Sequence, residues 1–361
     1  MQGAQKLRSA AHLRVRRNDE VAAQSRSERD RWTFYETIIY VQAKGLIVGV
    51  PLRGKGGGRE HAMSKLKTMK EAVGQYIKDG QSILISGFSI NQGYSFSHEI
   101  IRQKKRNLTL IRSSGDILAD QMIGAGCVSR IISPYVWNPT GPSSAYCFRR
   151  SIEKGIPHKI ELEELSFGSF CMAIYAAAHG LPFMPTYPLE GTGIFQHRSI
   201  LGPDKVRVIA SPFSGEKVCL VKPLVPEVGL IHVQRADPEG NAQMWGPLGD
   251  VRGTANAGKM VIVAAEEIVD RATILQEPYK TIVPGFRVSA VVHEPWGAHP
   301  SDVFEYYYRD IWFTAEYAEA SRTVEGFQKF MGEWVYGVES RDEYMKKVGA
   351  KKEELRWRKQ K

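Results

Sequence analysis

The sequence lacks the features that several large protein classes require. No run of 18 or more apolar residues occurs, and the best candidate for a membrane span, residues 37–52, is short and carries Gln42 and Lys44. A spanning helix needs about 20 apolar residues, so we expect no contact with a membrane. The 361 residues are 43% apolar, which is enough to bury one large or two modest cores.

Cysteine is scarce and is not paired in sequence. The four cysteines, Cys127, Cys147, Cys171 and Cys219, form no C-x-x-C pair and lie in apolar segments. Free cysteine behaves as a small apolar residue, whereas disulfide frameworks and zinc sites need regular spacings. The pattern predicts reduced core thiols, no metal site and a cytoplasmic protein.

Phosphate-binding glycine motifs are also missing. Neither G-x-G-x-x-G nor G-x-x-x-x-G-K-[ST] occurs, so the sequence does not support a dinucleotide or P-loop site.

The net charge of +10 is concentrated at the two ends. Residues 1–62 hold 12 lysines and arginines against 6 acidic residues, and residues 346–361 hold 8 against 2. A protein that binds nucleic acid carries its basic residues on the folded face. We therefore expect no nucleic-acid partner.

The same ends differ from the rest of the chain in pattern. We interpret residues 1–62 as a non-native or disordered leader, with Met63 as the native start, because the segment is arginine-rich without an apolar period and its acidic residues argue against a targeting peptide. Residues 63–345 contain no repeat or linker and are interpreted as one α/β domain, followed by a basic tail at 346–361.

From Met63 onward, helical and strand patterns alternate. Helices are predicted at 68–80, 97–106 and 116–126, and strands at 81–88, 108–113 and 128–133. Further strands of the same sheet are expected at 205–213, 216–224, 228–246, 259–269 and 287–300, with a tight turn at 236–242 and helices at 323–337 and 340–360. This order predicts an open, mostly parallel sheet with helices on both faces, whose ligands bind beyond the carboxyl ends of the strands.

Four loops in this pattern are rich in Gly, Ser and Asn: 86–95, 112–116, 135–144 and 187–193. Such residues let backbone N–H groups approach an anion or a carbonyl oxygen closely. For each loop taken alone, ordinary turn formation is the simpler explanation.

The segments DGQSILISGF (79–88), LIRSSGD (110–116), 213–246, KMVIVAAEEIV (259–269) and GAHPS (297–301) together carry a family resemblance. In this order and spacing they resemble the alpha subunits of family I coenzyme A transferases, and most closely the alpha subunit of glutaconate CoA-transferase. The resemblance covers about residues 64–350. The chain departs from the family's Gly-Gly-Phe pattern at Ser86, and its loop lacks the usual proline.

The resemblance implies that the partner is a homologous beta subunit, with the active site between the two chains. In the family a glutamate of that partner attacks an acyl-CoA, an acyl anhydride forms, and the released thiolate converts it to a glutamyl-CoA thioester, from which a second carboxylic acid takes the CoA. Covalent catalysis of this kind gives ping-pong kinetics. Coenzyme A is then a substrate, no cofactor is bound, and no catalytic residue is expected in this chain.

The resemblance also implies which residues contact the acyl-CoA: Gly87, Phe88, Ser89, Ser113, Ser114, Gly115, Glu190, Gly191, Thr192 and Gly193. Glu190 is interpreted as a lining or turn residue, with a catalytic acid or base as the alternative. Gly191 and Gly193 are favoured as positions where the backbone comes close to the acyl group.

Several residues have two interpretations each. Ser113 to Gly115 either form the acyl pocket or cap the following helix, and Arg112 either pairs with a substrate carboxylate or lies on the surface. His232 and His299 have no acidic partner recognisable in the sequence and are interpreted as hydrogen-bonded structural residues rather than bases. Three tryptophans towards the C-terminus are interpreted as residues that pack helices together or contact another subunit: Trp312, Trp334 and Trp357.

Two other functions stay open at this point. Relatives of such subunits are CoA-thioester hydrolases that open rings in steroid degradation, and a glutamate at the nucleophile position of the partner would separate transfer from hydrolysis. A non-catalytic sensor would need an attached helix-turn-helix, and the N-terminal arm shows none.

Overall fold

The computed structural model describes residues 64–358 except 139–143, 188, 197–198 and 203–204. The interpretation of residues 1–62 as a leader concerns a segment outside the described residues, as does the middle of the 135–144 loop.

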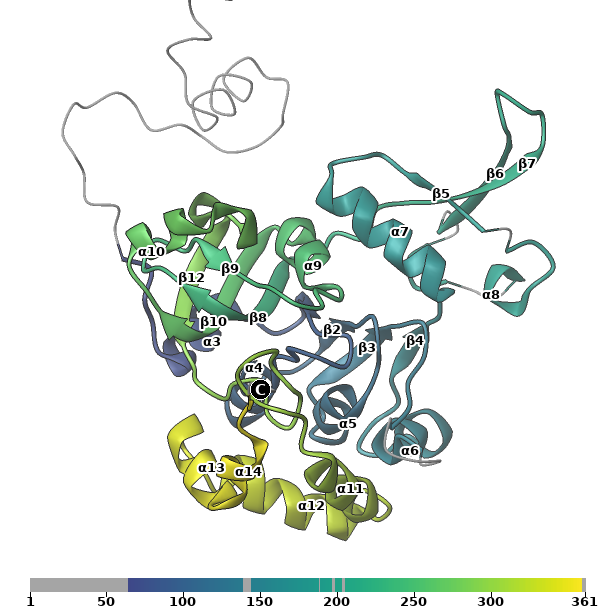
Figure 1. The fold of residues 1–361 in the computed structure, drawn as a ribbon. Helices are drawn as coiled ribbons and strands as arrows, with labels where there is room; N and C mark the ends of the chain where they lie inside the picture. Colours follow the sequence, from purple (N-terminus) through teal and green to yellow (C-terminus); the bar gives the residue numbers. More distant parts are fainter. Residues whose placement is uncertain (1–63, 139–143, 188, 197–198, 203–204, 359–361) are drawn as a thin grey trace, which may run out of the picture. The chain divides into compact units, whose positions relative to one another are not determined.

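The main sheet is nine-stranded and mostly parallel (Figure 1). Its parallel strands run in the order β12-β10-β8-β1-β2-β3-β4. Two short antiparallel strands, β9 and β11, extend it beside the carboxyl end of β8. The strand bounds are β1 Ser82–Ile85, β2 Leu108–Ile111, β3 Val128–Ile132, β4 Glu161–Glu163, β8 Val228–Ala236, β9 Ala242–Gln243, β10 Met260–Ile268, β11 Thr281–Val283 and β12 Val288–His293.

The segments 205–213 and 216–224 were expected in the main sheet, and this was wrong. They form β6 (Val206–Ala210) and β7 (Lys217–Val221), which pair with β5 (Met184–Thr186) in a separate antiparallel sheet. Burial alternates along β7, as in an antiparallel sheet with one solvated face. The short connection between β6 and β7 closes a hairpin, and a hairpin cannot supply neighbouring parallel strands.

Helices cover both faces of the main sheet, as predicted. α4, α5 and α6 lie on one face, and α7 and α9 lie on the other (Figure 1). The helix bounds are α3 Met69–Tyr76, α4 Tyr94–Arg102, α5 Ile117–Gly124, α6 Tyr146–Lys154, α7 Phe167–Ala178, α8 Gly193–Gln196, α9 Val251–Ala257, α10 Arg271–Gln276, α11 Ile311–Ala320, α12 Val324–Met331, α13 Arg341–Val348 and α14 Lys351–Leu355. Short 3₁₀ helices lie at Pro278–Lys280 and Gly285–Arg287, and a π-helix lies at Gly332–Tyr336.

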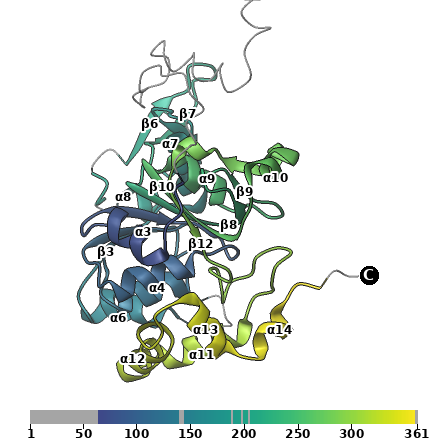
Figure 2. The same cartoon turned by 90° about the vertical axis from the view of Figure 1, so that its left-hand side faces the viewer.

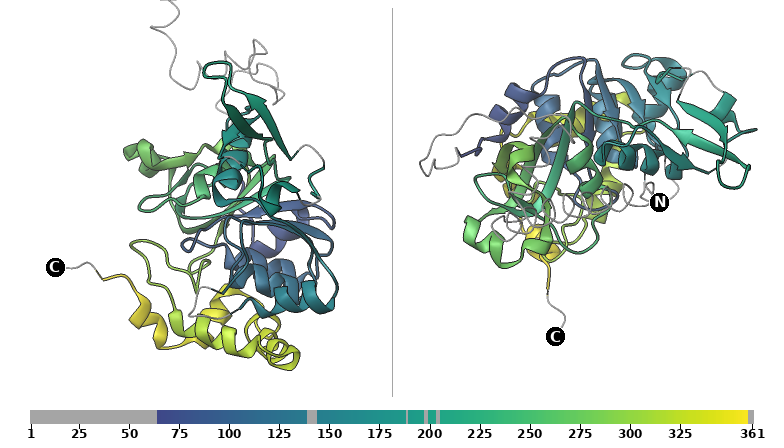
Figure 3. Two further views of the ribbon diagram at one scale, coloured as in Figure 1. Left: turned by 90° about the vertical axis from the view of Figure 1, so that its right-hand side faces the viewer. Right: turned by 90° about the horizontal axis from the view of Figure 1, so that it is seen from above.

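The C-terminal helices α11, α12 and α13 pack on the outer side of α4 and α5 (Figures 2 and 3). Trp334 lies in this layer against Phe313 and Phe330, whereas Trp312 is exposed and Trp357 stacks on Tyr308. Within the described residues, no helix combines the length and apolarity needed to cross a membrane.

Alternate strand residues belong to opposite layers of the core. Ile83 and Ile85 of β1 pack with α4 and α5, whereas Leu84 packs with α7. Both faces of these strands are covered, which explains their nearly continuous apolar runs. Because β1, β2 and β3 are parallel neighbours, the loops that follow them meet at one edge of the sheet.

Candidate active site

Three of the four Gly/Ser-rich loops come together at this edge. The N–H of Gly115 donates to the carbonyl of Tyr135 (3.0 Å), which joins the loops after β2 and β3. The side chain of Arg112 joins the loops after β1 and β2. The fourth loop, 187–193, follows β5 of the small sheet and lies outside this group.

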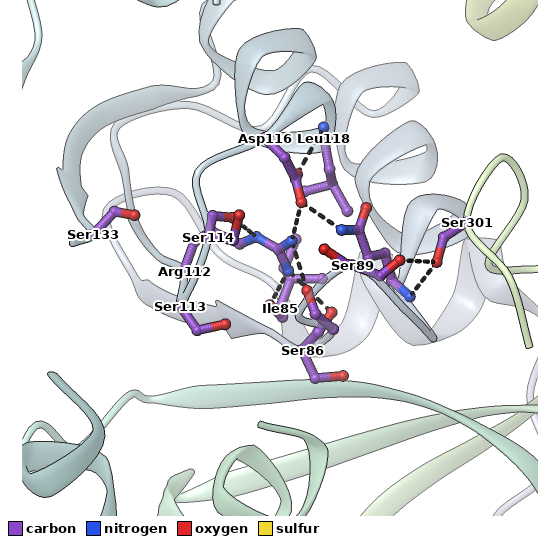
Figure 4. A network of polar contacts seen from close by, with 12 residues as sticks. Ile85, Ser86, Ser89, Arg112, Ser113, Ser114, Asp116, Leu118, Ser133 and Ser301 are labelled. Carbon is purple, nitrogen blue, oxygen red and sulfur yellow. Dashed lines mark hydrogen bonds and ion pairs between the residues drawn. The ribbon is translucent and has the colours of Figure 1, made fainter. Parts of the chain in front are cut away.

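Arg112 is the centre of the loop arrangement (Figure 4). Its side chain is fully buried, and its five N–H groups are all used. It donates to the carbonyls of Ser86 (3.0 Å), Gly87 (3.0 Å) and Ser114 (3.1 Å), and also to that of Ile85. An ion pair with Asp116 at 3.1 Å balances the buried charge. Both predictions for Arg112, a surface arginine and a partner of a substrate carboxylate, were wrong, because its donors all hold the protein's own loops.

The loop after β1 has an unusual backbone. Gly87 has φ +111° and Ser89 has φ +65°, and a Cβ at position 87 would lie 2.6 Å from the Cα of Gln92, so only glycine fits. The carbonyl of Ser89 accepts from Ser301 Oγ (3.2 Å) and from Arg309. The N–H groups of Phe88 and Ser89 make no hydrogen bond to another described residue, so they are available to a ligand.

Asp250, the residue before α9, links two of these loops. One carboxylate oxygen accepts from the N–H of Gly87 (2.7 Å), and the other accepts from the hydroxyl of Ser113 (2.5 Å). Sequence reasoning missed Asp250, because nothing in its local spacing marks it and its partners lie 163 and 137 positions earlier in the chain.

Ser114 and its neighbours do not cap the helix that follows. The N-cap of α5 is Asp116, whose side chain accepts from the N–H of Leu118. Gly115 packs so closely that a Cβ would lie 2.7 Å from the side chain of Val136. The capping alternative for Ser113 to Gly115 is therefore wrong.

Two cavities open beside these loops, and Phe88 lines both. Cavity 1 has a volume of about 790 Å³ and is lined by Phe88, Ser113, Phe167, Phe170, Cys171, Ile174, Tyr175, Ala178, His179, Gly249, Asp250, Arg252, Gly253 and Asn256. Cavity 2 has a volume of about 420 Å³ and is lined by Phe88, Ser89, Gln92, Tyr94, Ser114, Asp116, Ile117, Tyr135, Trp137, Pro300, Ser301, Arg309, Ile311 and Thr314. Ser113 and Ser114, which are adjacent in sequence, thus face different cavities.

The loop with Glu190 lines neither of these cavities. Glu190 lies in a turn, and its carboxylate is 3.5 Å from the ammonium of Lys217, in an exposed pair. Gly191 has φ +81° with open space around it, the Thr192 hydroxyl donates to the carbonyl of Leu189 (2.6 Å), and Gly193 begins α8. A binding role for residues 190–193 stays a prediction.

His232 and His299 are fully buried and hydrogen-bonded, as predicted. Their acidic partners, however, had not been recognised in the sequence: His232 Nε2 lies 2.7 Å from Glu266, and His299 Nε2 lies 3.4 Å from Asp310. Burial lowers the pKa of His299 to about 4, so this ring is neutral at pH 7. Neither histidine lines cavity 1 or cavity 2.

The described residues contain no cluster of three or more His, Cys, Asp or Glu side chains suited to a metal ion. What the loops offer instead is a set of hydrogen-bond donors, the N–H groups of Phe88 and Ser89 and the hydroxyl of Ser114, close to two cavities. Donors of this kind, fixed by their surroundings, stabilise an oxygen that gains negative charge.

Residues 66–294 match the family model of Coenzyme A transferase, and the chain belongs to this family. The A-type subunit of the 3-oxoadipate CoA-transferase of Pseudomonas knackmussii is 35% identical to it over 287 residues, which are 79% of this chain and 99% of the relative. The A-type subunit of the glutaconate CoA-transferase of Acidaminococcus fermentans is 35% identical over 300 residues, 80% of this chain and 93% of the relative. The resemblance inferred from the sequence is confirmed.

Structural comparison agrees with this assignment. The crystal structure of glutaconate coenzyme A-transferase from Acidaminococcus fermentans matches with a TM-score of 0.76 and 33% identity, over 82% of this chain and 96% of that chain. A more distant relative from Mycobacterium tuberculosis, named as the IpdA subunit of a cholesterol ring-cleaving hydrolase, is 27% identical over 76% of this chain and 94% of the relative.

Proposed function

We propose that this chain is the alpha subunit of a heteromeric CoA-transferase, which moves CoA between an acyl-CoA and a carboxylic acid. The observation that carries the proposal is the state of the carboxylates beside the cavities. Asp250 is held by Gly87 and Ser113, and Asp116 is held by Arg112 and Gln92. Neither is free to attack an acyl group, so the nucleophile comes from a partner chain. The names of the two 35% identical relatives, both A-type subunits, support such a partner.

In the proposed mechanism a glutamate of the partner attacks the acyl-CoA carbonyl and expels the CoA thiolate, which leaves an acyl anhydride. The thiolate then attacks the glutamyl carbonyl of the anhydride, so that a glutamyl-CoA thioester forms and the first carboxylate leaves. A second carboxylate repeats these steps in reverse and takes the CoA. The N–H groups of Phe88 and Ser89 stabilise the oxyanion of the tetrahedral intermediate. The carbonyls of the same loop do not compete for this position, because Arg112 and Arg309 bind them by hydrogen bonds.

The test is reconstitution. The purified chain is assayed alone and after mixing with its partner subunit, with CoA transfer from an acyl-CoA to acetate followed by mass spectrometry. We expect no turnover by the chain alone and restored turnover in the mixture. Turnover by a preparation that mass spectrometry shows to be free of any partner would contradict the assignment.

A second candidate is hydrolysis of a CoA thioester, and the 27% identity to the ring-cleaving hydrolase subunit favours it. The two functions differ in the partner chain. A glutamate at the partner's nucleophile position gives ping-pong transfer, whereas its absence leaves water as the attacking group. Release of free acid from acyl-CoA without any acceptor would identify the hydrolase.

A further inference from the structure

We propose that cavity 1 holds the acyl chain of the substrate and selects a chain that is apolar to its end, without a second carboxylate. This inference rests on the proposed function and names the substrate class of the same site.

Cavity 1 is continuous with the catalytic loops. Phe88 and Ser113, which belong to the loops after β1 and β2, form part of its wall. The volume of about 790 Å³ is typical of a cavity that encloses a whole small molecule. An acyl carbonyl placed at the N–H groups of Phe88 and Ser89 can therefore extend its chain into this space.

The wall of cavity 1 is mainly apolar. α7 contributes one stripe of side chains at helical spacing, and Phe88 continues it with its ring 5.3 Å from that of Phe167. The apolar lining residues are Phe88, Phe167, Phe170, Ile174, Tyr175 and Ala178. Removing an aliphatic chain from water against such a wall is favourable, and the gain grows with each buried CH₂.

The charged groups of cavity 1 decide between a monocarboxylic and a dicarboxylic acyl group. The carboxylate of Asp250 disfavours a second carboxylate beside it, while Arg252 and His179, which also line the cavity, are exposed to solvent, where pairing with a charge contributes little. His179 already stacks on Tyr175 at 3.9 Å and contacts its carbonyl. Burial, with Asp250 nearby, raises the pKa of the Cys171 thiol, so this group is neutral as well.

A terminal carboxylate in cavity 1 would thus lie among rings without a buried cation among the lining residues. Burying an unpaired charge is strongly unfavourable. A methyl group at the same place has no such cost, which makes the end of the chain the point of selection.

The first experiment uses the reconstituted complex of this chain with its partner. Hexanoyl-CoA and adipoyl-CoA have acyl chains of equal carbon number and differ at the end group alone. We expect kcat/KM to be at least about tenfold higher for hexanoyl-CoA, the size of effect that a differing end group produces in a matched pocket. Equal or reversed values would overturn the inference while leaving the transferase assignment intact.

A cavity-filling variant places the acyl chain. Ala178→Phe should lower the ratio of hexanoyl-CoA to acetyl-CoA turnover by about tenfold, because the added ring takes volume from cavity 1 that a six-carbon chain needs more than a two-carbon chain does. An unchanged ratio in a folded variant would place the acyl chain elsewhere.

A binding measurement completes the test without turnover. Cys171 lines cavity 1, whereas the three other cysteines are buried, so maleimide should label Cys171 selectively in the complex. Hexanoyl-CoA should slow this labelling at least about fivefold, and adipoyl-CoA should not. This ratio corresponds to a difference of about 1 kcal/mol in the free energy of binding. Absence of protection, or a Cys171 that never reacts because the partner covers it, would overturn the inference. Protection without transfer of any acyl group would contradict the proposed function instead.

Discussion

Arg112 allows the clearest test of how the loops are held. Arg112→Lys keeps the positive charge but replaces five N–H donors in a fixed plane by an ammonium with three. The five acceptors of Arg112 include the carbonyls of Ser86 and Gly87. Lysine therefore leaves at least two of the five acceptors buried without this donor. Each such group costs about 1–3 kcal/mol, so the free energy of unfolding should fall by about 4 kcal/mol.

The assay is urea unfolding followed by circular dichroism, together with transferase activity of the reconstituted complex. Arg130→Lys is the matched control, because Arg130 lies 2.7 Å from Glu161 in an ion pair whose side chains are 56% and 58% exposed. A pair of this kind contributes less than about 1 kcal/mol. If Arg112→Lys costs less than about 1 kcal/mol and retains full activity, Arg112 does not organise the site.

Three further predictions concern single side chains. Asp250→Asn should lower kcat by about tenfold or more with less than about threefold change in KM, since either Gly87 or Ser113 loses its acceptor. Steady-state kinetics that show a change in KM alone would contradict this prediction. Burial lowers the pKa of His299 to about 4, so the unfolded chain binds the proton first as pH falls below about 6.5. The difference in free energy of unfolding between the wild type and His299→Gln, measured by urea titration, should therefore shrink by about 2 kcal/mol from pH 7 to pH 5. A difference that stays constant with pH would refute the burial argument. Gly191→Val should destabilise the loop by about 1–3 kcal/mol because of the positive φ at this position. It should also reduce turnover more than Glu190→Gln does, and Glu190→Gln should lower turnover by less than about tenfold. The reverse order would make Glu190 a catalytic residue.

The parallel sheet could be predicted because its strands are buried on both faces. Segments such as 82–85 and 108–111 are apolar except at Ser82 and Thr109 and alternate with helical patterns, and this local signal survives in the fold. Segments 206–210 and 217–221 carry the same apolar signal but form a separate hairpin, because composition does not specify which strands pair.

The site could be predicted only as far as its loops. Ser113 and Phe88 follow recognisable strands, so their position at the edge of the sheet was predictable. The burial of Arg112 and the role of Asp250 depend on contacts between distant segments, and the acidic partner of His232 lies 34 residues away. Such pairs are set by the packing of the whole chain and leave no local pattern.

The most direct test of the central claim is to locate the covalent intermediate. The reconstituted complex is incubated with acyl-CoA, the glutamyl-CoA thioester is reduced with borohydride, and the modified glutamate is identified by peptide mass spectrometry. We predict that the reduced glutamate lies in the partner chain, while every glutamate of this chain, Glu190 included, is unmodified. A reduced glutamate in this chain would contradict the assignment of the nucleophile to the partner.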